Sequence, residues 1–219
     1  MSLLISFEGI EGCGKTTQAD LLNNFLTSQG YSCLVTREPG GTRIGDQIRS
    51  LLLHSENTDL ALKAELFLYI ASRAQHVEEV ILPALRAGRM IICDRFIDST
   101  TVYQGLVQGI DLAVIDDLNR MATSGIKPDL TFIIDCPVED GLKRAWGRIE
   151  IKDRTIDDVR FENKDMDFHR RVRDGYLSLA TREPERIRVI DGNRERMVIH
   201  RDIASLVSEK LKVKGGGIG

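Results

Sequence analysis

Short apolar segments alternate along the chain with longer stretches of helical periodicity. The apolar segments lack the strict apolar–polar alternation of a strand with one face in water, and they are typical of strands covered on both faces. They predict five strands, at residues 3–7, 32–36, 90–93, 130–134 and 187–190. One sheet with both faces covered is therefore expected.

Predicted helices connect these strands. In residues 15–28, Ala19, Leu22 and Leu26 recur at the spacing of one helix face. Further helices are predicted at residues 61–87, 112–123, 138–146, 167–180 and 196–211. Pro83 is expected to kink or break the first of these. Alternating strands and helices predict an α/β fold with a mostly parallel sheet.

Length and composition fit one folded domain. The chain of 219 residues is long enough to bury a core, and 42% hydrophobic with 29% charged residues excludes global disorder. We expect a single domain over residues 1–213, followed by a glycine-rich, frayed tail over residues 214–219.

The charge balance and the cysteines narrow the class of protein. The 30 Lys and Arg against 33 Asp and Glu give a net charge of −3, which disfavours a general binder of nucleic acid or membrane surfaces. The chain has no run of about 18 apolar residues, so no membrane span is predicted. The N-terminus does not resemble a signal peptide. The four cysteines are far apart, without a CxxC pair. This spacing favours reduced thiols in a cytoplasmic protein over a zinc or redox site.

Residues 148–167 differ from the rest of the chain. Their first part, residues 148–160, is rich in charge and poor in apolar residues. Two interpretations stay open: a solvated loop or exposed helix, and a mobile flap that closes over a charged substrate.

The most specific motif is a phosphate-binding loop at residues 9–16. The sequence GIEGCGKT fits G-x-x-x-x-G-K-[ST] at every fixed position, between a predicted strand and a predicted helix. Its glycines let backbone N–H groups converge on an anion, and the helix N-terminus adds partial positive charge. The predicted ATP-binding residues are Gly9, Ile10, Glu11, Gly12, Cys13, Gly14, Lys15 and Thr16.

The loop predicts a site for a nucleoside triphosphate, most simply ATP, but it does not decide the reaction. Lys15 is expected at the β- and γ-phosphates, and the Thr16 hydroxyl is expected to ligate Mg²⁺. The chain lacks an Asn-Lys-x-Asp motif for guanine, which disfavours a GTPase. It is also small for a motor or helicase.

A charged pair, Asp94-Arg95, follows the third predicted strand. Ligands of open parallel sheets bind beyond the carboxyl ends of the strands, so Asp94 is placed to share the Mg²⁺ ion with Thr16 and Arg95 to stabilise charge on a transferring phosphoryl group. The alternative is a surface ion pair that ends the strand.

Seven segments together give the chain a specific resemblance. They are residues 7–18 (FEGIEGCGKTTQ), 36–42 (TREPGGT), 71–73 (ASR), 94–99 (DRFIDS), 103–105 (YQG), 128–130 (PDL) and 168–176 (FHRRVRDGY). In this order and spacing the chain resembles the thymidylate kinase (dTMP kinase) family along nearly its whole length. The resemblance implies transfer of a phosphoryl group from ATP to dTMP with Mg²⁺, giving ADP and dTDP. It also implies a nucleoside-monophosphate-kinase-like fold with a five-stranded parallel sheet, a mobile lid at about residues 144–162, and a homodimer.

The resemblance also implies roles for individual residues. Arg95 and Arg49 would bind near the dTMP phosphate, Tyr69 would stack on thymine where the family usually has Phe, and Arg73 would donate to a thymine carbonyl. Tyr103 would crowd the 2′ position of the sugar. The implied acceptor-site residues are Glu11, Glu38, Arg49, Tyr69, Arg73, Arg95, Thr100, Tyr103 and Gln104. Taken alone, Tyr69 fits a core residue, Arg73 a salt bridge, and Glu38 a turn residue.

The loop carries no arginine or lysine at its four variable positions. Bacterial family members of this kind are thought to supply a cation from the lid instead. Arg160, in the step Arg-Phe-Glu before the helix that carries Tyr176, fits that role best, and Arg154 is the second candidate. The implied catalytic residues are therefore Lys15, Asp94, Arg95, and Arg160 or Arg154.

Three other functions remain open from the residues alone. They are a kinase for another nucleotide, a non-catalytic module that uses ATP as a switch, and an ATPase that binds nucleic acid. The intact Asp94-Arg95 pair argues against the switch, and the acidic balance argues against the nucleic-acid ATPase. The four histidines show no pairing that can be interpreted.

Overall fold

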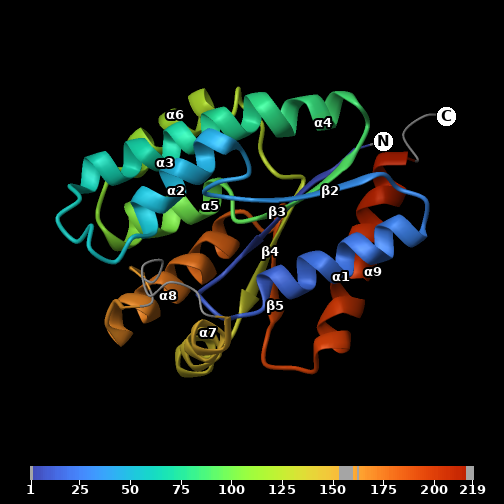
Figure 1. Ribbon diagram of the computed structural model, residues 1–219. Coiled ribbons are helices and arrows are strands. Elements are labelled where there is room, and N and C mark those ends of the chain that lie inside the picture. The colour runs from blue at the N-terminus through green and yellow to red at the C-terminus, as the bar shows by residue number, and fades with distance from the viewer. Residues whose placement is uncertain (1, 153–159, 162, 216–219) are drawn as a thin grey trace.

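The computed structural model describes residues 2–152, 160–161 and 163–215, and it contains one parallel sheet of five strands (Figure 1). The strands lie in the order β2-β3-β1-β4-β5. They are β1 (Leu4–Glu8), β2 (Cys33–Arg37), β3 (Met90–Asp94), β4 (Leu130–Asp135) and β5 (Ile187–Asp191). All five predicted strands are confirmed, each to within one residue at either end, and so is the fold class.

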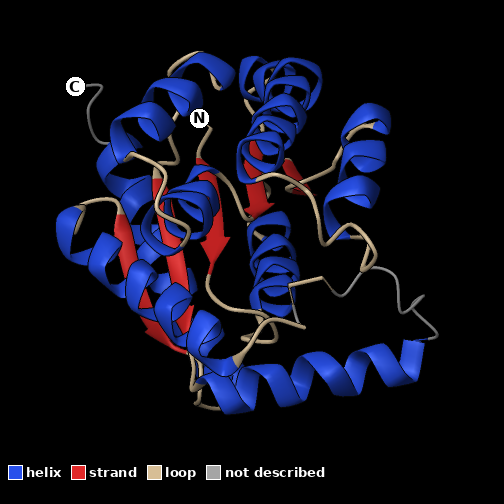
Figure 2. Cartoon of the chain, turned by 90° about the vertical axis from the view of Figure 1, so that its left-hand side faces the viewer, coloured by secondary structure: helices blue, strands red, loops and turns tan. Residues whose placement is uncertain are grey.

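Helices cover both faces of the sheet (Figure 2). They are α1 (Lys15–Ser28), α2 (Arg43–Leu53), α3 (Leu62–His76), α4 (Leu82–Arg86), α5 (Ile97–Thr100), α6 (Leu112–Ala122), α7 (Val138–Lys152), α8 (Met166–Arg182) and α9 (Arg196–Gly215), with the π-helical segments η1 (Val77–Ile81) and η2 (Thr101–Val107). Along β1, Leu4 packs with Val77 and Ile81 of η1, whereas Ile5 belongs to the cluster that contains Leu22 of α1. Successive side chains of the strand thus face opposite layers.

The central position of β1 brings three chain segments to one edge of the sheet. Phe7 of β1 pairs with Asp94 of β3 on one side and with Phe132 of β4 on the other. Because all strands are parallel, the loop after β1 and the end of β3 meet at the same carboxyl edge. The candidate site is built there.

The structure refines the predicted helices. Residues 62–86 of the predicted helix 61–87 are helical, and the regular α-helical turns are interrupted by the π turn η1 directly before Pro83; a kink at Pro83 stays a prediction. The sequence analysis did not predict α2 or the helical segment α5–η2. Thr42 caps α2 by accepting a hydrogen bond from the Gly45 N–H at 2.9 Å, and Ile44, Ile48 and Leu52 recur at the spacing of one helix face, so α2 had a readable signal.

The predicted C-terminal tail and the predicted lid agree with the structure only in part. Helix α9 continues to Gly215, and Lys214 Nζ donates to the Ser2 carbonyl at 3.0 Å and to Asp129 Oδ1 at 2.9 Å, so the first two residues of the predicted tail are helical. Residues 153–159 and 162 of the predicted lid, and residues 216–219 of the tail, lie outside the described residues. The lid and the single-domain division stay predictions.

Candidate active site

Glycines shape the loop that joins β1 to α1. Gly9, Gly12 and Gly14 have φ angles of 133°, 72° and 105°, which residues with side chains rarely adopt. At Gly12, a Cβ would lie 1.8 Å from the carbonyl oxygen of Gly141 on α7. The loop can follow this path only with glycine at that position.

Lys15 is the first residue of α1, and its side chain turns back over the loop. Its Nζ donates to the carbonyl oxygens of Gly9 at 3.1 Å and Ile10 at 2.8 Å, and only 8% of the residue is exposed. The helix N-terminus adds partial positive charge at the same place. Loop, ammonium and helix end therefore form one cationic site at the edge of the sheet.

Thr16 and Asp94 place two oxygen ligands side by side. Thr16 Oγ1 donates to Asp94 Oδ2 at 2.6 Å. Mg²⁺ prefers such oxygens and commonly takes one or two from the protein and the rest from phosphates and water. Among the described residues, no group of three or more His, Cys, Asp or Glu side chains could hold a metal. The pair therefore fits a cation that is shared with a nucleotide.

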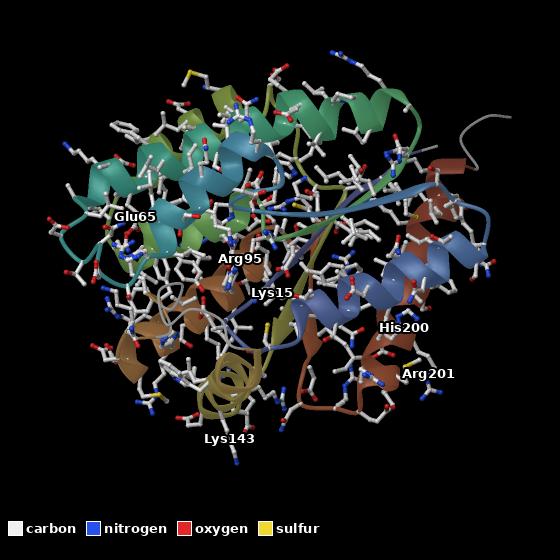
Figure 3. The ribbon with its side chains drawn as sticks, viewed as in Figure 1. Lys15, Glu65, Arg95, Lys143, His200 and Arg201 are labelled. Carbon is white, nitrogen blue, oxygen red and sulfur yellow. The ribbon has the colours of Figure 1, made fainter. Side chains whose placement is uncertain are left out.

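Arg95 lies between Lys15 and Glu65, at the centre of the site (Figure 3). Its NH2 group donates to Glu11 Oε1 at 3.0 Å and to the Tyr103 hydroxyl at 3.3 Å. Its NH1 group donates to the Tyr176 hydroxyl at 3.0 Å. The backbone of Arg95 has a φ of 69°, which costs a non-glycine residue about 1 kcal/mol. These contacts fix the guanidinium next to the phosphate-binding loop.

A buried carboxylate, Glu8, lies behind Arg95 at the end of β1. It accepts from the Phe96 N–H at 2.8 Å, the Ser99 hydroxyl at 2.6 Å and the Tyr176 hydroxyl at 2.8 Å. Burial, together with the nearby charge of Asp98, raises the pKa of Glu8 from 4.5 to about 7. Glu8 is thus a group that changes charge near neutral pH directly under the site.

Glu11, in the loop itself, stays ionised. Its Oε1 accepts from the Tyr103 hydroxyl at 2.6 Å, and its Oε2 lies 3.3 Å from His169 Nδ1. Burial opposes ionisation, but His169 and the charges of Arg95 and Lys15 outweigh it and hold the pKa of Glu11 well below its usual range. The site therefore presents a permanent carboxylate to a ligand that reaches Arg95.

A second polar group surrounds Arg73 on α3, of which only 2% is exposed. Its Nε donates to Glu38 Oε2 at 2.8 Å, and its NH1 donates to Thr100 at 3.0 Å and Asn119 at 2.6 Å. Its NH2 donates to the Phe96 carbonyl at 3.0 Å. A guanidinium has five N–H groups, so within the described chain one N–H of Arg73 is left for a ligand.

The residues expected to face a ligand at this N–H of Arg73 come from two helices, and on each helix they are spaced by one turn. Glu65, Tyr69 and Arg73 share one face of α3 because they are spaced by four. Thr100 and Gln104 lie one turn apart on α5–η2, and Gln104 Nε2 donates to Glu65 Oε1 at 2.8 Å. The pairs Arg73–Thr100 and Glu65–Gln104 therefore bracket Tyr69, which packs half-buried against the core.

Arg160 lies at this second group and not at the phosphate-binding loop. Its NH1 is 2.7 Å from Glu65 Oε2 and donates to the Leu52 carbonyl at 3.2 Å. Its proposed contact with phosphates stays a prediction, and Arg154 lies outside the described residues. Arg49 of α2 donates to the Pro39 carbonyl at 3.0 Å, in the loop that carries Glu38.

Comparisons with known proteins agree with this geometry. The family model described as thymidylate kinase matches residues 7–203. A thymidylate kinase of Desulfosudis oleivorans is 56% identical over 86% of this chain and 88% of its own length. One of Citrifermentans bemidjiense is 49% identical over 100% of this chain and 95% of its own length. The crystal structure of thymidylate kinase from Ehrlichia chaffeensis matches with a TM-score of 0.75 and 37% identity, covering 94% of this chain and 98% of that one.

The chain belongs to the thymidylate kinase family. The resemblance stated from the sequence is therefore confirmed over nearly the whole chain. Membership makes the protein an enzyme, and this sets aside the switch module and the nucleic-acid ATPase. No helix among the described residues of this family member is both long and apolar enough to cross a bilayer.

Sequence reasoning missed several residues of the site in this thymidylate kinase family member. They are Glu8, Glu65, His76, Ser99, His169 and Tyr176. Glu8, Ser99, His169 and Tyr176 stand inside the motifs quoted for the resemblance, so their position was a usable signal. Glu65 and His76 gave none, because their partners are at least 38 residues away along the chain.

Proposed function

We propose that the protein transfers the γ-phosphoryl group of ATP to dTMP, giving ADP and dTDP, with Mg²⁺ as its metal ion. A phosphate oxygen of dTMP attacks the γ-phosphorus, and the bond from that phosphorus to the bridging oxygen of ADP breaks. The observation that carries the proposal is the position of Arg95, which donates to Glu11 of the phosphate-binding loop at 3.0 Å and to Tyr103 at 3.3 Å on η2, the segment that also carries Gln104. A site for one nucleotide alone needs no such link.

The ATP side uses the loop and its neighbours. The backbone N–H groups of residues 9–16 and Lys15 Nζ would hold the β- and γ-phosphates, and the contacts of Lys15 with Gly9 and Ile10 keep its ammonium over the loop. Mg²⁺ on Thr16 Oγ1 and Asp94 Oδ2 would neutralise charge that develops on the phosphate oxygens.

The acceptor side uses Arg95 and the two facing helices. Arg95 would bind the dTMP phosphate and stabilise the transferring group. Glu11 and Tyr103, joined at 2.6 Å, would face the sugar. Tyr69 would stack on thymine, with its hydroxyl kept neutral because burial and Glu65 raise its pKa. The remaining N–H of Arg73 would donate to a thymine carbonyl.

A coupled assay of ADP release tests this function. ATP and Mg²⁺ are held constant while dTMP, dUMP, UMP, CMP, AMP, GMP and thymidine are offered in turn. Turnover that strongly favours dTMP supports the proposal. Preference for another acceptor would keep the phosphate chemistry and overturn the roles of Tyr69, Arg73 and Thr100, whereas ATP binding without acceptor-dependent ADP would overturn the whole proposal.

We further propose that the enzyme is a cytoplasmic homodimer. Leu62 and Phe67 of α3 and Val114 and Met121 of α6 are large apolar side chains that are 37–71% exposed, and the two helices pack against each other. Such a group of apolar side chains is typical of a protein–protein interface. The cysteines, free among the described residues, suit a reducing compartment.

A further inference from the structure

The orientation of one buried amide sets the chemistry that the acceptor base meets. We infer that Glu65 is a positioning residue that selects the base, because it determines which end of the Gln104 amide faces the ligand. The inference rests on the proposed function and deepens it, since it names the group that distinguishes a base with an N3–H donor from one with an N3 acceptor.

Glu65 holds the amide through hydrogen bonds that allow a single orientation. Its carboxylate is 2% exposed, as is Gln104. Oε1 of Glu65 accepts from Gln104 Nε2 at 2.8 Å and from Gln108 Nε2 at 3.1 Å. A carboxylate oxygen can only accept, so Gln104 must turn its NH₂ group toward Glu65. The opposite orientation would bring two acceptor oxygens together in a buried place.

The carbonyl oxygen of Gln104 is consequently the end that is left for a ligand. No hydrogen bond to Gln104 Oε1 occurs within residues 2–152, 160–161 and 163–215, whereas its neighbour one turn earlier, Thr100, is engaged by Arg73 at 3.0 Å. Tyr69 lies between these two pairs on α3. The ring on which the base would stack thus has an acceptor on one side and a guanidinium on the other.

This arrangement matches the hydrogen-bonding edge of thymine or uracil. These bases carry an N3–H donor beside a C4 carbonyl, so Gln104 would accept from N3–H and Arg73 would donate to O4. Cytosine has an acceptor at N3 and an amino group at C4. A site whose buried polar groups fit one pattern strongly rejects the other, because mismatched groups stay unpaired.

Arg160 makes the effect of changing Glu65 predictable. Its NH1 lies 2.7 Å from Oε2 of Glu65 and requires an acceptor there. In Glu65→Gln the new amide oxygen would therefore stay at Arg160, and its NH₂ would point at Gln104. Gln104 would then turn its own oxygen to that NH₂ and present its NH₂ to the base.

The experiment compares kcat and KM for dTMP and dCMP in the wild type and in Glu65→Gln. We expect the KM for dTMP to rise about tenfold with kcat changed less than about threefold, because the lost contact is made equally in ground and transition states. The ratio of kcat/KM for dTMP over dCMP should fall at least tenfold. An unchanged ratio in a folded variant would overturn the inference.

A double variant separates base selection from a loss of structure. In the double variant Glu65→Gln with Gln104→Glu, the amide at position 65 donates to the carboxylate at position 104, so the donor and acceptor exchange places and the total charge is kept. The second carboxylate oxygen at position 104 again offers an acceptor to the base. This variant should recover most of the dTMP preference, whereas a variant with a damaged core would not. If Glu65→Gln fails to fold, this variant alone decides, since a dTMP preference below that of the wild type by tenfold or more would overturn the inference.

Gln108→Leu is the matched control, because it removes the other donor to the same Glu65 oxygen. The KM for dTMP and the preference for dTMP over dCMP should both stay within about twofold; a shift as large as that of Glu65→Gln would mean that Glu65 acts on packing in general. A different observation tests the proposed function: it is overturned if the wild type shows no dTMP-dependent release of ADP.

Discussion

Replacing Glu8 by glutamine should make the stability of the protein less dependent on pH. In the folded protein the pKa of Glu8 is about 7, against 4.5 for the ordinary carboxyl. The folded state therefore binds more protons than the unfolded state between these values. The contribution of Glu8 is fully present below pH 4.5 and is lost as the pH rises through 7.

The size of the effect follows from the two pKa values. One pKa unit corresponds to about 1.4 kcal/mol, so a shift from 4.5 to about 7 gives at most about 3.5 kcal/mol at pH 8. The coupling to Asp98 shares part of this cost, and we expect a change of about 1–3 kcal/mol. The amide of Glu8→Gln keeps the shape of the carboxyl and can still bond the Phe96 N–H and the hydroxyls of Ser99 and Tyr176.

Urea unfolding of the wild type and Glu8→Gln, at several pH values from 5 to 8, measures the difference. The free energy of unfolding of the variant minus that of the wild type should rise by about 1–3 kcal/mol from pH 5 to pH 8. Glu78→Gln, on the exposed part of η1, should give a constant difference. If the difference in unfolding free energy between Glu8→Gln and the wild type changes by less than about 0.5 kcal/mol from pH 5 to pH 8, the raised pKa of Glu8 is refuted.

Three further changes test the proposed chemistry and assembly. At least one of Arg160→Ala and Arg154→Ala should lower kcat about tenfold or more, about 1.4 kcal/mol of barrier, and if neither does, the lid does not supply the cation. Asp94→Asn should raise the Mg²⁺ concentration for half-maximal activity about tenfold, because a neutral amide binds the ion less well, and an unchanged Mg²⁺ titration would remove Asp94 from the metal site. Phe67→Glu should shift the mass measured by light scattering toward the monomer, and a wild type that is already monomeric would contradict the proposed dimer.

The sequence alone allowed the strands and the phosphate-binding loop to be predicted, since both are local patterns. Parallel strands covered on both faces leave continuous apolar segments, and the loop needs glycines, a lysine and a hydroxyl within eight positions. Of the two facing helices, α3 was predicted within residues 61–87, whereas α5–η2 was not. Helix α5–η2 contains the polar Thr100 and Gln104 on its buried side, and its π-helical turns change the period that a sequence pattern reveals.

Arg160 illustrates a limit of another kind. Its charge and its place before α8 suggested a partner among phosphates, but in the structure it pairs with Glu65 on α3. A buried carboxylate such as Glu65 attracts any arginine that can reach it, and nothing in the local sequence marks Glu65 as buried. Partners of this kind depend on tertiary packing and therefore had to come from the structure.

The spacing of Glu65, Tyr69 and Arg73 along α3 has a consequence for how this enzyme can diverge. Because each residue adds about 100° of rotation to a helix, inserting or deleting one residue ahead of Tyr69 would turn part of this row away from Thr100 and Gln104. Single substitutions within the row would leave the loop at residues 9–16 and the end of β3 untouched. Evolution and engineering can therefore change the choice of base one side chain at a time while phosphoryl transfer continues. Neither can insert or delete a residue in α3 ahead of Tyr69 without disrupting this row.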